Sequence, residues 1–496
     1  MAINFIPNDP RVLGNLVAMR QVEPHPDRSA GRADFNFSGQ VPAGLFVPGT
    51  PEFLFWQCRE AALTAIDLWE EISGAPYTTW QGGTKIDLLQ DAGVDLNAFY
   101  DRASLSFFHQ KVGTKTYFSG ASTDVVAHEA GHGFLDALRP TFIQSNAFEV
   151  NAFHEAFGDC VAILTGLLDS ATRTAVLPDL AKKNGLESTA EELSFAISKA
   201  FPGHNAGAPR RALNKFQWAP PGTLPTTGGP GVLIAEIHSF GQVFSGCFYD
   251  LILNIFNRLG GGTSANLLQA SMTAGKLLVN AATQVPQRTQ FFREVGRTML
   301  LVDQQLHGGA SVGDIRSAFQ NHSIPLGSTV MLAPQTSLAG AAPVGGTIAA
   351  VLKKDLLGRL RAAPAAKLAV KAIQIAGNKI TESIHERLIG LSHLHSKLKG
   401  VMAMAQDTVL LGDVNAHAVV LGEMPDVDNT AADVELFVKS LLKNNAIQFG
   451  APKATAVAGI ARALAPSVTH VIKTVRGQKV LTRVRYACRG CSWQPR

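Results

Sequence analysis

The chain has 496 residues, more than one ordinary hydrophobic core organises, and this length predicts two or three domains. Hydrophobic residues make up 46% of the chain and charged residues 17%, a globular composition that excludes a wholly disordered protein. The formal net charge of +5 is small for this length, so charge alone does not mark the whole chain as a nucleic-acid-binding protein.

The N-terminus and the cysteine content bear on where the protein works. Residues 1–10 lack the basic start and the apolar run of roughly 7–15 residues that mark a secretory signal. The uncharged stretch 323–352 is interrupted by prolines, including Pro334 and Pro343, so we interpret it as a linker rather than a membrane span. Five scattered cysteines fit a reducing compartment better than a disulfide framework. We expect a cytoplasmic protein, with non-classical export left open.

In chain order, the hydrophobic pattern predicts an N-terminal extension and then one α+β domain. Residues 1–50 are rich in Pro, Gly and Asn and have no clear period. Apolar residues at helical spacing follow between Phe53 and Trp69, and residues 86–118 show shorter, strand-like runs that include a hairpin. We assign residues 51–326 to this domain. Further helices are predicted over 122–138, 147–168, 188–200, 238–258, 264–283, 288–305 and 312–320.

The last third of the chain is predicted to form accessory parts. A linker rich in Pro, Gly and Ala spans 327–352, a basic helical segment spans 353–405, and a small basic α/β domain spans 406–496. Within that domain, apolar runs on either side of the turn Arg476-Gly477-Gln478 predict a β-hairpin.

The C-terminal residues carry two weaker signals. Residues 451–496 contain nine Lys or Arg and no Asp or Glu, and the hairpin would place Lys479, Arg483 and Arg485 on one cationic face. This face could bind an anionic partner such as nucleic acid or a membrane surface, although a solvated basic face is the favoured interpretation. Cys488 and Cys491 have the spacing of half a zinc ribbon or of a redox pair, but two unlinked thiols are favoured.

The strongest chemical signal is the sequence His-Glu-x-x-His at residues 128–132. His128 and His132 are four residues apart and therefore share one face of a helix, where both imidazoles can bind a single metal ion. Glu129 projects to one side, where its carboxylate can reach a water on that ion. Two nitrogen ligands and a carboxylate base are what zinc-dependent hydrolysis requires. The competing interpretation of the motif alone is an ordinary helix with these side chains in solvent.

The following helix offers candidates for a third ligand. A catalytic zinc takes three protein ligands and keeps an open position for water. Glu155 and Asp159 are again four residues apart, and their apolar neighbours argue against a solvated acidic stripe. We expect Glu155 to complete the ligand set and Asp159 to accept the second ring N–H of His128, which would fix the tautomer of that ring. Glu149 and His154 are competing ligands that rank below Glu155.

These segments resemble the thermolysin-type zinc metallopeptidases, the glutamate-zincins. The resemblance is carried by residues 124–132 and 151–159 and runs from about residue 50 to 325. It implies an α+β fold of two lobes, a β-containing N-terminal lobe and a helical C-terminal lobe at about 188–326. The zinc helices then span about 122–168, and the zinc-binding helix lies at the floor of the cleft between the lobes.

The resemblance also implies roles for further residues. Asn97 and Ala98 begin a segment like the family's edge strand, which holds the substrate backbone. Arg211 is the better match to the family's substrate-binding arginine, and His238 matches its transition-state-stabilising histidine. The side of the helix that carries Val125 would line an apolar pocket, favouring a bulky hydrophobic residue after the cleaved bond.

The implied activity is that of a zinc-dependent metalloendopeptidase acting on peptide or protein substrates. In the mechanism that the resemblance implies, a zinc-activated water attacks the peptide bond and Glu129 serves as general base. His238 and Arg211 would stabilise the oxyanion and hold the substrate carbonyl. The implied cofactor is Zn²⁺.

The chain departs from the family pattern at several points. The family places a tyrosine between the second zinc histidine and the glutamate, and this chain has no Tyr from residue 118 to 248. Leu233 stands at the spacing of the aspartate that backs the family's histidine, with Glu236 close by at a different spacing. The family's Asn-Ser-Gly is replaced by Ser-Phe-Gly at 239–241, and the acidic calcium-binding clusters have no clear counterpart. These departures motivate an alternative: a weakly active or inactive zinc-binding scaffold whose cleft or basic C-terminal domain binds a protein or anionic partner.

Overall fold

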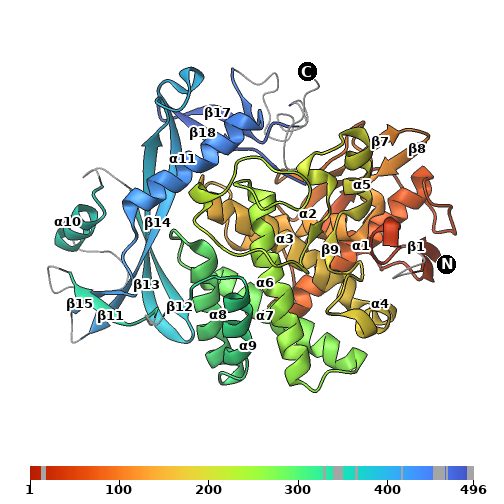
Figure 1. Cartoon of the computed structure of the whole chain (residues 1–496), viewed down its shortest axis with the longest axis horizontal. Helices are drawn as coiled ribbons and strands as arrows, with labels where there is room; N and C mark the ends of the chain where they lie inside the picture. Colours follow the sequence, from red (N-terminus) through yellow and green to blue (C-terminus); the bar gives the residue numbers. More distant parts are fainter. Residues whose placement is uncertain are drawn as a thin grey trace.

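The structure, a computed structural model, describes residues 1–12, 18–327, 331–338, 350–362, 367–414, 417–450, 464 and 467–488. Within these residues the fold is mixed α+β, which confirms the predicted fold class at that level. The first two thirds of the chain form a helical body with a small sheet, and the last third forms a long sheet beside it (Figure 1).

Helix α1 (Pro51–Ser73) begins and ends at recognisable sequence signals. The Thr50 hydroxyl accepts a hydrogen bond from Phe53 N at 3.2 Å, and Pro51 occupies the first helical position. Gly74 ends the helix with a φ of 70°, a left-handed conformation that glycine adopts without steric cost. The apolar side chains of α1 enter the main hydrophobic core, which fixes its position beneath the neighbouring helices.

The small sheet has five strands and combines both ends of the chain. Four of its strands and an adjoining hairpin come from the N-terminal part: β3 (Asp34–Phe37), β4 (Lys85–Leu89), β5 (Ala98–Tyr100), β6 (Ser104–Phe107), β7 (His109–Val112) and β8 (Lys115–Phe118). β4 is parallel to β3 and β6, whereas β5 is antiparallel to β6. The other edge of β5 pairs with β19 (Tyr486–Ala487). The hairpin predicted within 86–118 is confirmed as β7 and β8.

Residues 1–50 are part of the folded body. β1 (Ile3–Phe5) pairs antiparallel with β2 (Arg20–Val22), and β3 joins the small sheet. The amide side chain of Gln57 on α1 accepts from Ile6 N at 2.8 Å and donates to Ile6 O at 2.9 Å. The predicted extension therefore supplies a sheet strand and buried contacts to the domain that follows it.

The helical body is built around α3 (Phe148–Leu168), which is buried along almost its whole length because apolar and small residues occur on all its sides. The other helices and two short strands are α2 (Thr123–Leu138), α4 (Ser170–Val176), β9 (Ser188–Thr189), α5 (Glu191–Ala200), β10 (Arg210–Arg211), α6 (Ile237–Arg258), α7 (Ser264–Gln284), α8 (Phe291–His307) and α9 (Val312–Asn321). The predicted helices are confirmed within a few residues, except that the segment predicted over 188–200 opens with β9.

A search for membrane-spanning helices among the described residues finds no single helix that is both long and apolar enough. One bent pair, Phe148–Leu168 with Ser170–Asp179 at 100° to it, passes by length and composition only.

The last third of the chain forms strands where the sequence predicted a basic helical segment over 353–405. Helix α10 (Ala350–Arg359) covers only the beginning of that segment. The rest contains β12 (Leu368–Ile375), β13 (Asn378–Gly390) and the start of β14 (Val401–Val414), so the helical prediction is wrong for most of its length.

Two turn residues explain why this segment pairs as strands. Ala376 and Gly377 have positive φ angles of 48° and 77°, as a two-residue hairpin turn of the type I′ kind requires. The turn sets Ile375 opposite Asn378, and the two strands stay paired along the whole of β12. Cross-strand pairing thus overrides the Ala-, Leu- and Lys-rich composition that favoured a helix.

The remaining elements complete an eight-stranded mixed sheet against which α10 and the last helix of the chain's described part pack. They are β11 (Pro334–Ser337), β15 (His417–Leu421), α11 (Val427–Lys443), β16 (Ile447–Gln448), β17 (His470–Val475) and β18 (Gln478–Arg483). β11 lies within the predicted linker 327–352, of which 328–330 and 339–349 lie outside the described residues. The predicted hairpin is confirmed as β17 and β18, which are antiparallel, while β18 also pairs in parallel with β14.

The long sheet and the helical body share one hydrophobic core. Leu398, Val401 and Leu481 from the C-terminal part belong to the same buried cluster as the helices of the body. Asn146 N, in the loop before α3, donates to Met404 O on β14 at 3.0 Å. The predicted domain boundary at residue 326 therefore does not coincide with a break in the core.

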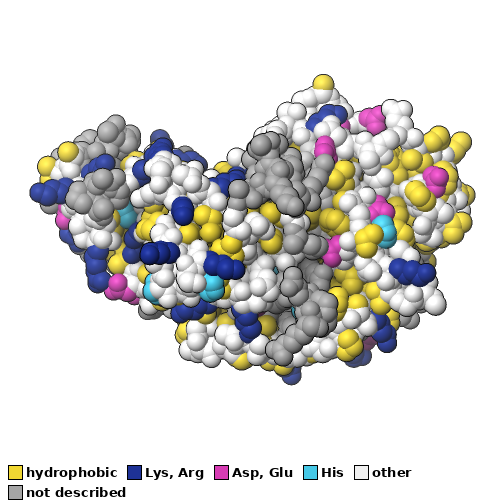
Figure 2. All heavy atoms as spheres, turned by 90° about the horizontal axis from the view of Figure 1, so that it is seen from above, with side chains coloured by type: hydrophobic (Ala, Val, Ile, Leu, Met, Phe, Trp, Pro, Cys, Tyr) yellow, Lys and Arg dark blue, Asp and Glu magenta, His cyan; other side chains and the backbone are white. Residues whose placement is uncertain are grey.

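Of the three residues of the predicted cationic face, Lys479 is exposed but both arginines are buried, so the face does not form as predicted. Arg483 and Arg485 are only 8% and 2% exposed. Arg483 donates to Asn151 Oδ1 at 2.8 Å, and the guanidinium of Arg485 lies over the ring of Phe99. On the face shown in Figure 2, Lys and Arg side chains are scattered over the end of the molecule formed by the last third. Half of 451–496 lies outside the described residues, so an anionic partner stays a prediction.

The contact of His25 with α1 gives a test of how the N-terminal segment is held. His25 Nδ1 lies 2.5 Å from Glu60 Oε2 and Nε2 lies 3.1 Å from Asp67 Oδ2. Hydrogen bonds to Asp67 and Glu60 raise the pKa of His25 from 6.5 to about 9. Because the folded-state pKa is raised, this stabilisation is fully present below pH 6.5 and is lost as the pH rises through about 9.

We expect His25→Gln to lower the free energy of unfolding by about 1 kcal/mol at pH 6, a value discounted for the partial exposure of the ring. The difference from wild type should shrink as urea unfolding is repeated towards pH 9. His417→Gln, at an exposed position on β15, is the control and should change stability little at any pH. A His25→Gln deficit that grew with pH would contradict this assignment.

Candidate metal centre

Two glycines allow helices α2 and α3 to cross at close range. A Cβ atom added to Gly131 would lie 3.0 Å from Gly158 Cα, so the two backbones nearly touch. A Cβ atom added to Gly158 would lie 2.6 Å from His128 Nδ1, closer than side chains tolerate. The imidazole of His128 therefore lies directly against the backbone of α3, which brings it next to the carboxylates that this helix carries.

The crossing gathers three candidate ligands in one buried space. His128 Nε2 and His132 Nε2 lie 3.5 and 3.7 Å from Glu155 Oε2, and the two rings are inclined at 81°. These three side chains are at most 1% exposed. The Nε2 atoms of both histidines and both carboxylate oxygens of Glu155 have no hydrogen-bond partner. Donors that share one tetrahedral ion at 2.0–2.2 Å stand about 3.4 Å apart. The three residues fit a common metal ion.

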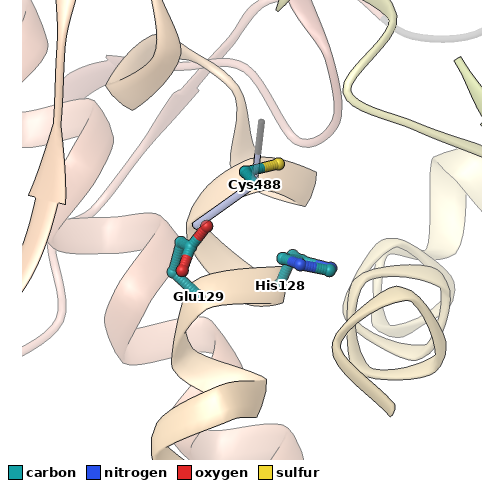
Figure 3. Close-up of side chains that lie close together, drawn as sticks. All are labelled: His128, Glu129 and Cys488. Atoms are coloured by element: carbon teal, nitrogen blue, oxygen red, sulfur yellow. The ribbon is translucent and has the colours of Figure 1, made fainter. Parts of the chain in front are cut away.

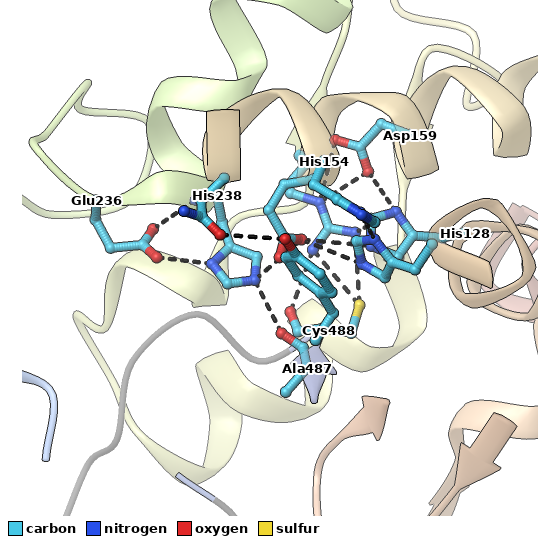
Figure 4. Close-up of polar contacts among 12 residues, drawn as sticks. His128, His154, Asp159, Glu236, His238, Ala487 and Cys488 are labelled. Carbon is cyan, nitrogen blue, oxygen red and sulfur yellow. Dashed lines mark hydrogen bonds and ion pairs between the residues drawn. The ribbon is translucent and has the colours of Figure 1, made fainter. Parts of the chain in front are cut away.

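The outer nitrogens of both rings have partners that leave Nε2 free for a metal. His128 Nδ1 lies 3.0 Å from Asp159 Oδ1, and His132 Nδ1 lies 2.9 Å from His154 Nδ1. Burial lowers the pKa of His132 well below 6.5, so this ring stays in the neutral form that binds metals. The structure brings Asp159 to the position expected for it beside His128 (Figure 4). His154, considered as a competing ligand, contacts the outer nitrogen of His132 instead.

Glu149, the other competing ligand, lies outside the cluster. It accepts a hydrogen bond from Trp218 Nε1 at 2.5 Å and another from Phe292 N at 3.3 Å. Burial raises the pKa of its carboxyl to about 7. These contacts direct the side chain towards the loop and helix that cover the far part of α3, and they exclude it from the ligand set.

Glu129 lies beside the ligands and makes no hydrogen bond of its own. Both of its carboxylate oxygens are buried without a partner, and burial raises its pKa to about 8. A ligand atom of Glu129, one of His128 and the sulfur of Cys488 all lie within 4.8 Å of one another, as Figure 3 illustrates. An unpaired carboxylate next to a metal site has the position that a general base needs.

The arginine at this site is Arg210, whereas the sequence pointed to Arg211. Arg210 Nε donates to Asp159 Oδ1 at 2.9 Å, and its guanidinium lies next to His128. Arg211 instead forms ion pairs with Glu187 and Glu191. The two arginines occupy β10, where successive side chains point to opposite faces, so an error of one position moves the side chain away from the site.

His238 reaches the site from the first turn of α6 and is held by Glu236. The carboxylate of Glu236 accepts hydrogen bonds from the backbone N–H groups of His238 and Ser239 and from His238 Nδ1, the last at 2.7 Å. His238 Nε2 lies 3.2 Å from Glu155 Oε2. Burial alone would lower the pKa of His238, but Glu155 and Glu236 outweigh burial and raise it to about 9. Glu236 thus supplies the carboxylate contact to His238 that Leu233, at the spacing of the family's aspartate, cannot make.

The segments expected to contact substrate lie at the edge of the small sheet and beneath it. Ala98 O accepts a hydrogen bond from Cys488 N at 2.8 Å, and Asn97 precedes it at the start of β5. Val125 is fully buried on α2 and lines a small cavity together with Leu193. The structure brings β5 to the site but places it against the chain's own C-terminal residues.

Sequence reasoning missed the C-terminal residues at this site. Tyr486 stacks on His132 and His154, with ring centroids 4.6 and 4.0 Å apart and planes within 20°. Its hydroxyl donates to Asn151 Oδ1 at 3.1 Å. Two sequence signals bore on this segment: the lack of a tyrosine near the motif, and the zinc-ribbon-like spacing of Cys488 and Cys491. Neither indicated that Tyr486 would lie against the ligand histidines. Cys491 lies outside the described residues, so no pair with Cys488 is described.

Comparison of this chain with protein-family models and with curated proteins finds no match. The chemistry of the site therefore rests on the geometry of its own residues. Its buried His and Glu groups could hold a metal ion, whose identity these groups alone do not specify.

The close crossing of α2 and α3 gives a test of the centre. We expect Gly158→Ala to push the ring of His128 out of place, destabilise the fold by about 1–3 kcal/mol and lower metal affinity by about 10- to 100-fold. Metal content by elemental analysis and competition with a chromogenic chelator measure the effect. The matched control is Gly313→Ala on α9, where the added methyl group meets nothing within 4 Å and metal binding should be unchanged. Unchanged metal binding in Gly158→Ala would contradict the geometry.

Proposed function

We propose that this chain is a zinc metallopeptidase of the thermolysin type that hydrolyses internal peptide bonds of protein substrates. The observation that carries this proposal is the convergence of three buried ligand atoms without hydrogen-bond partners, from His128, His132 and Glu155, beside the unpaired carboxylate of Glu129. Two imidazoles and one carboxylate with a position left open are the ligand set of catalytic zinc. The contact of Asp159 with the outer nitrogen of His128 supports the same assignment.

The residues around the ligand set support peptide hydrolysis as the reaction. When bound, zinc supplies Lewis-acid polarisation of the substrate carbonyl and lowers the pKa of water towards neutrality. Glu129 accepts the proton of the attacking water and passes it to the leaving amine. His238 Nε2, held in place by Glu236, donates a hydrogen bond to the oxygen that becomes negative in the transition state. Arg210 holds Asp159 and can contact a neighbouring substrate carbonyl.

The same proposal assigns a place to the substrate. The small sheet and α2 form the N-terminal lobe, the helices from α3 onwards form the C-terminal lobe, and peptide binds between them along the edge of β5. An extended peptide added to this edge would satisfy the backbone groups that now pair with β19. The cavity beside Val125 is also lined by Asp95, Ser119 and Glu192 and has room for only about one water, so a place for a bulky hydrophobic side chain after the cleaved bond stays a prediction.

A second candidate function is a zinc-binding scaffold without peptidase activity. One observation favours it specifically: the edge of β5 is already paired with β19, and the ring of Tyr486 covers His132. A cleft filled in this way would bind metal without admitting a substrate. The two candidates differ in whether any hydrolysis depends on Glu129.

We expect Glu129→Gln to retain about one zinc per chain and to lower casein hydrolysis by about 10²- to 10⁴-fold relative to wild type, since the variant removes the base and leaves the ligands. Elemental analysis and release of acid-soluble peptides measure the two effects. His132→Ala is the companion variant and should lose both zinc and hydrolysis.

A wild-type chain without stoichiometric zinc, or Glu129→Gln chains that hydrolyse casein as fast as their parents in both the wild-type and the Cys488→Ala background, would contradict the peptidase. Stoichiometric zinc with no Glu129-dependent hydrolysis, in both the wild-type chain and the Cys488→Ala chain, would support the scaffold instead. The Cys488→Ala background is included because this side chain lies beside Glu129 and His128.

A further inference from the structure

The C-terminal residues 486–488 lie along β5 as a bound peptide would. β19 is antiparallel to β5, with Tyr486 opposite Tyr100 and Ala487 opposite Phe99. The pairing continues through Cys488 N, which donates to Ala98 O at 2.8 Å. Addition of an extended segment to a sheet edge is a general way in which proteins hold peptides, because the backbone supplies the hydrogen bonds. Here the segment belongs to the same chain.

Two side chains of the candidate site also hold the carbonyl groups of this segment. His238 Nε2 donates to Ala487 O at 2.9 Å, and Arg210 Nη1 donates to Cys488 O at 3.2 Å (Figure 4). Since a carbonyl oxygen only accepts, His238 Nε2 carries the proton in this contact. The histidine proposed to bind a substrate oxygen is therefore occupied by a peptide carbonyl of the chain itself.

The ring of Tyr486 anchors the segment against the ligand histidines. The ring stacks on His132 and His154. The guanidinium of Arg483, the last residue of β18, lies 4.1 Å from the centroid of the Tyr486 ring. The ring is fully buried, and its hydroxyl donates to Asn151 Oδ1. The segment is thus held by backbone pairing, by carbonyl contacts and by ring stacking, three kinds of contact that do not depend on one another.

The next side chain in this segment is the thiol of Cys488, which lies beside His128 and Glu129. Its sulfur lies within 4.8 Å of a ligand atom of His128 and of Glu129 (Figure 3). Two nitrogens of Arg210 lie 3.5 Å from the sulfur. Burial outweighs their positive charge and raises the pKa of the free thiol to about 12, so the metal ion itself has to displace the thiol proton. Thiolate is a strong zinc ligand, and zinc held by three protein ligands has one position left for it.

We propose that Cys488 is a fourth ligand of the metal and that residues 486–488 form an inhibitory strand that keeps the full chain latent. The thiol proton leaves to solvent as the sulfur–zinc bond forms, and the water that would occupy this position is displaced; no oxidation or reduction takes place. The inference rests on the proposed function, since it assumes zinc at the site. It differs from the scaffold proposal because removal of the thiol is expected to release activity.

X-ray absorption spectroscopy on the zinc-loaded full chain tests the ligand directly. We expect one sulfur at about 2.3 Å from zinc in wild type, and only nitrogen and oxygen at about 2.0–2.2 Å in Cys488→Ala. The matched control is Cys247→Ala, at an equally buried free cysteine on α6, which should keep the sulfur. Cys488→Ser, which nearly preserves the side-chain volume, replaces the alanine variant if that chain does not fold.

Casein hydrolysis by the same three proteins tests the inhibition. We expect the rate to rise about tenfold or more in Cys488→Ala and to stay at the wild-type value in Cys247→Ala, because a tethered ligand competes with substrate at a high effective concentration. The rise should disappear when Glu129→Gln is added to Cys488→Ala.

The outcomes separate this inference from the proposed function. Zinc surrounded only by nitrogen and oxygen in wild type would overturn the ligand assignment and leave the metallopeptidase standing, whereas a chain that binds no zinc would overturn both. Sulfur that persists in Cys488→Ala would assign the ligand to another cysteine. Sulfur that is lost without any rise in hydrolysis would overturn the inhibitory role of the strand.

Discussion

The site depends on three lone pairs, from His128, His132 and Glu155, that are buried close together without hydrogen-bond partners. Burying a polar atom without a partner costs about 1–3 kcal/mol, and a shared cation is a partner that satisfies all three at once. The cost is imposed by the rest of the fold. The glycine crossing of α2 and α3 presses His128 against Glu155, while Asp159 and His154 engage the outer ring nitrogens, so that neither ring can turn its inner nitrogen towards another partner.

The parts of this site that were predictable from sequence are those set by local periodicity. The shared faces of His128 with His132 and of Glu155 with Asp159 follow from helical geometry, and the helices themselves were marked by apolar spacing. The choice between Arg210 and Arg211 depended instead on the register of a two-residue strand. A single position reverses the direction of a strand side chain, and no local pattern marks the pairing of so short an element.

The incorrect prediction of a helical segment over residues 353–405 has a related cause. Ala, Leu and Lys favour helix when nothing else acts on them, but β13 has a partner on each side and its hairpin with β12 turns at Ala376 and Gly377. Strand pairing is a property of segments far apart in sequence, so composition could not reveal it. The contact of Tyr486 with His132 is an extreme case of the same limit, because hundreds of residues separate the two rings.

Taken together, these contacts give the long sheet a structural role, which is to position residues 486–488. β14 lies against the helical body through Met404 and pairs with β18, and β18 leads directly into residues 486–488. Arg483 and Arg485, which looked like a surface for anionic partners, instead pack over Tyr486 and Phe99 on either side of the segment. The basic character of the hairpin therefore serves an internal contact. A sheet rooted in the same core as the ligand helices can hold its final strand at the metal site only while both are folded, so the position of Cys488 depends on the integrity of the whole chain rather than on a flexible tail.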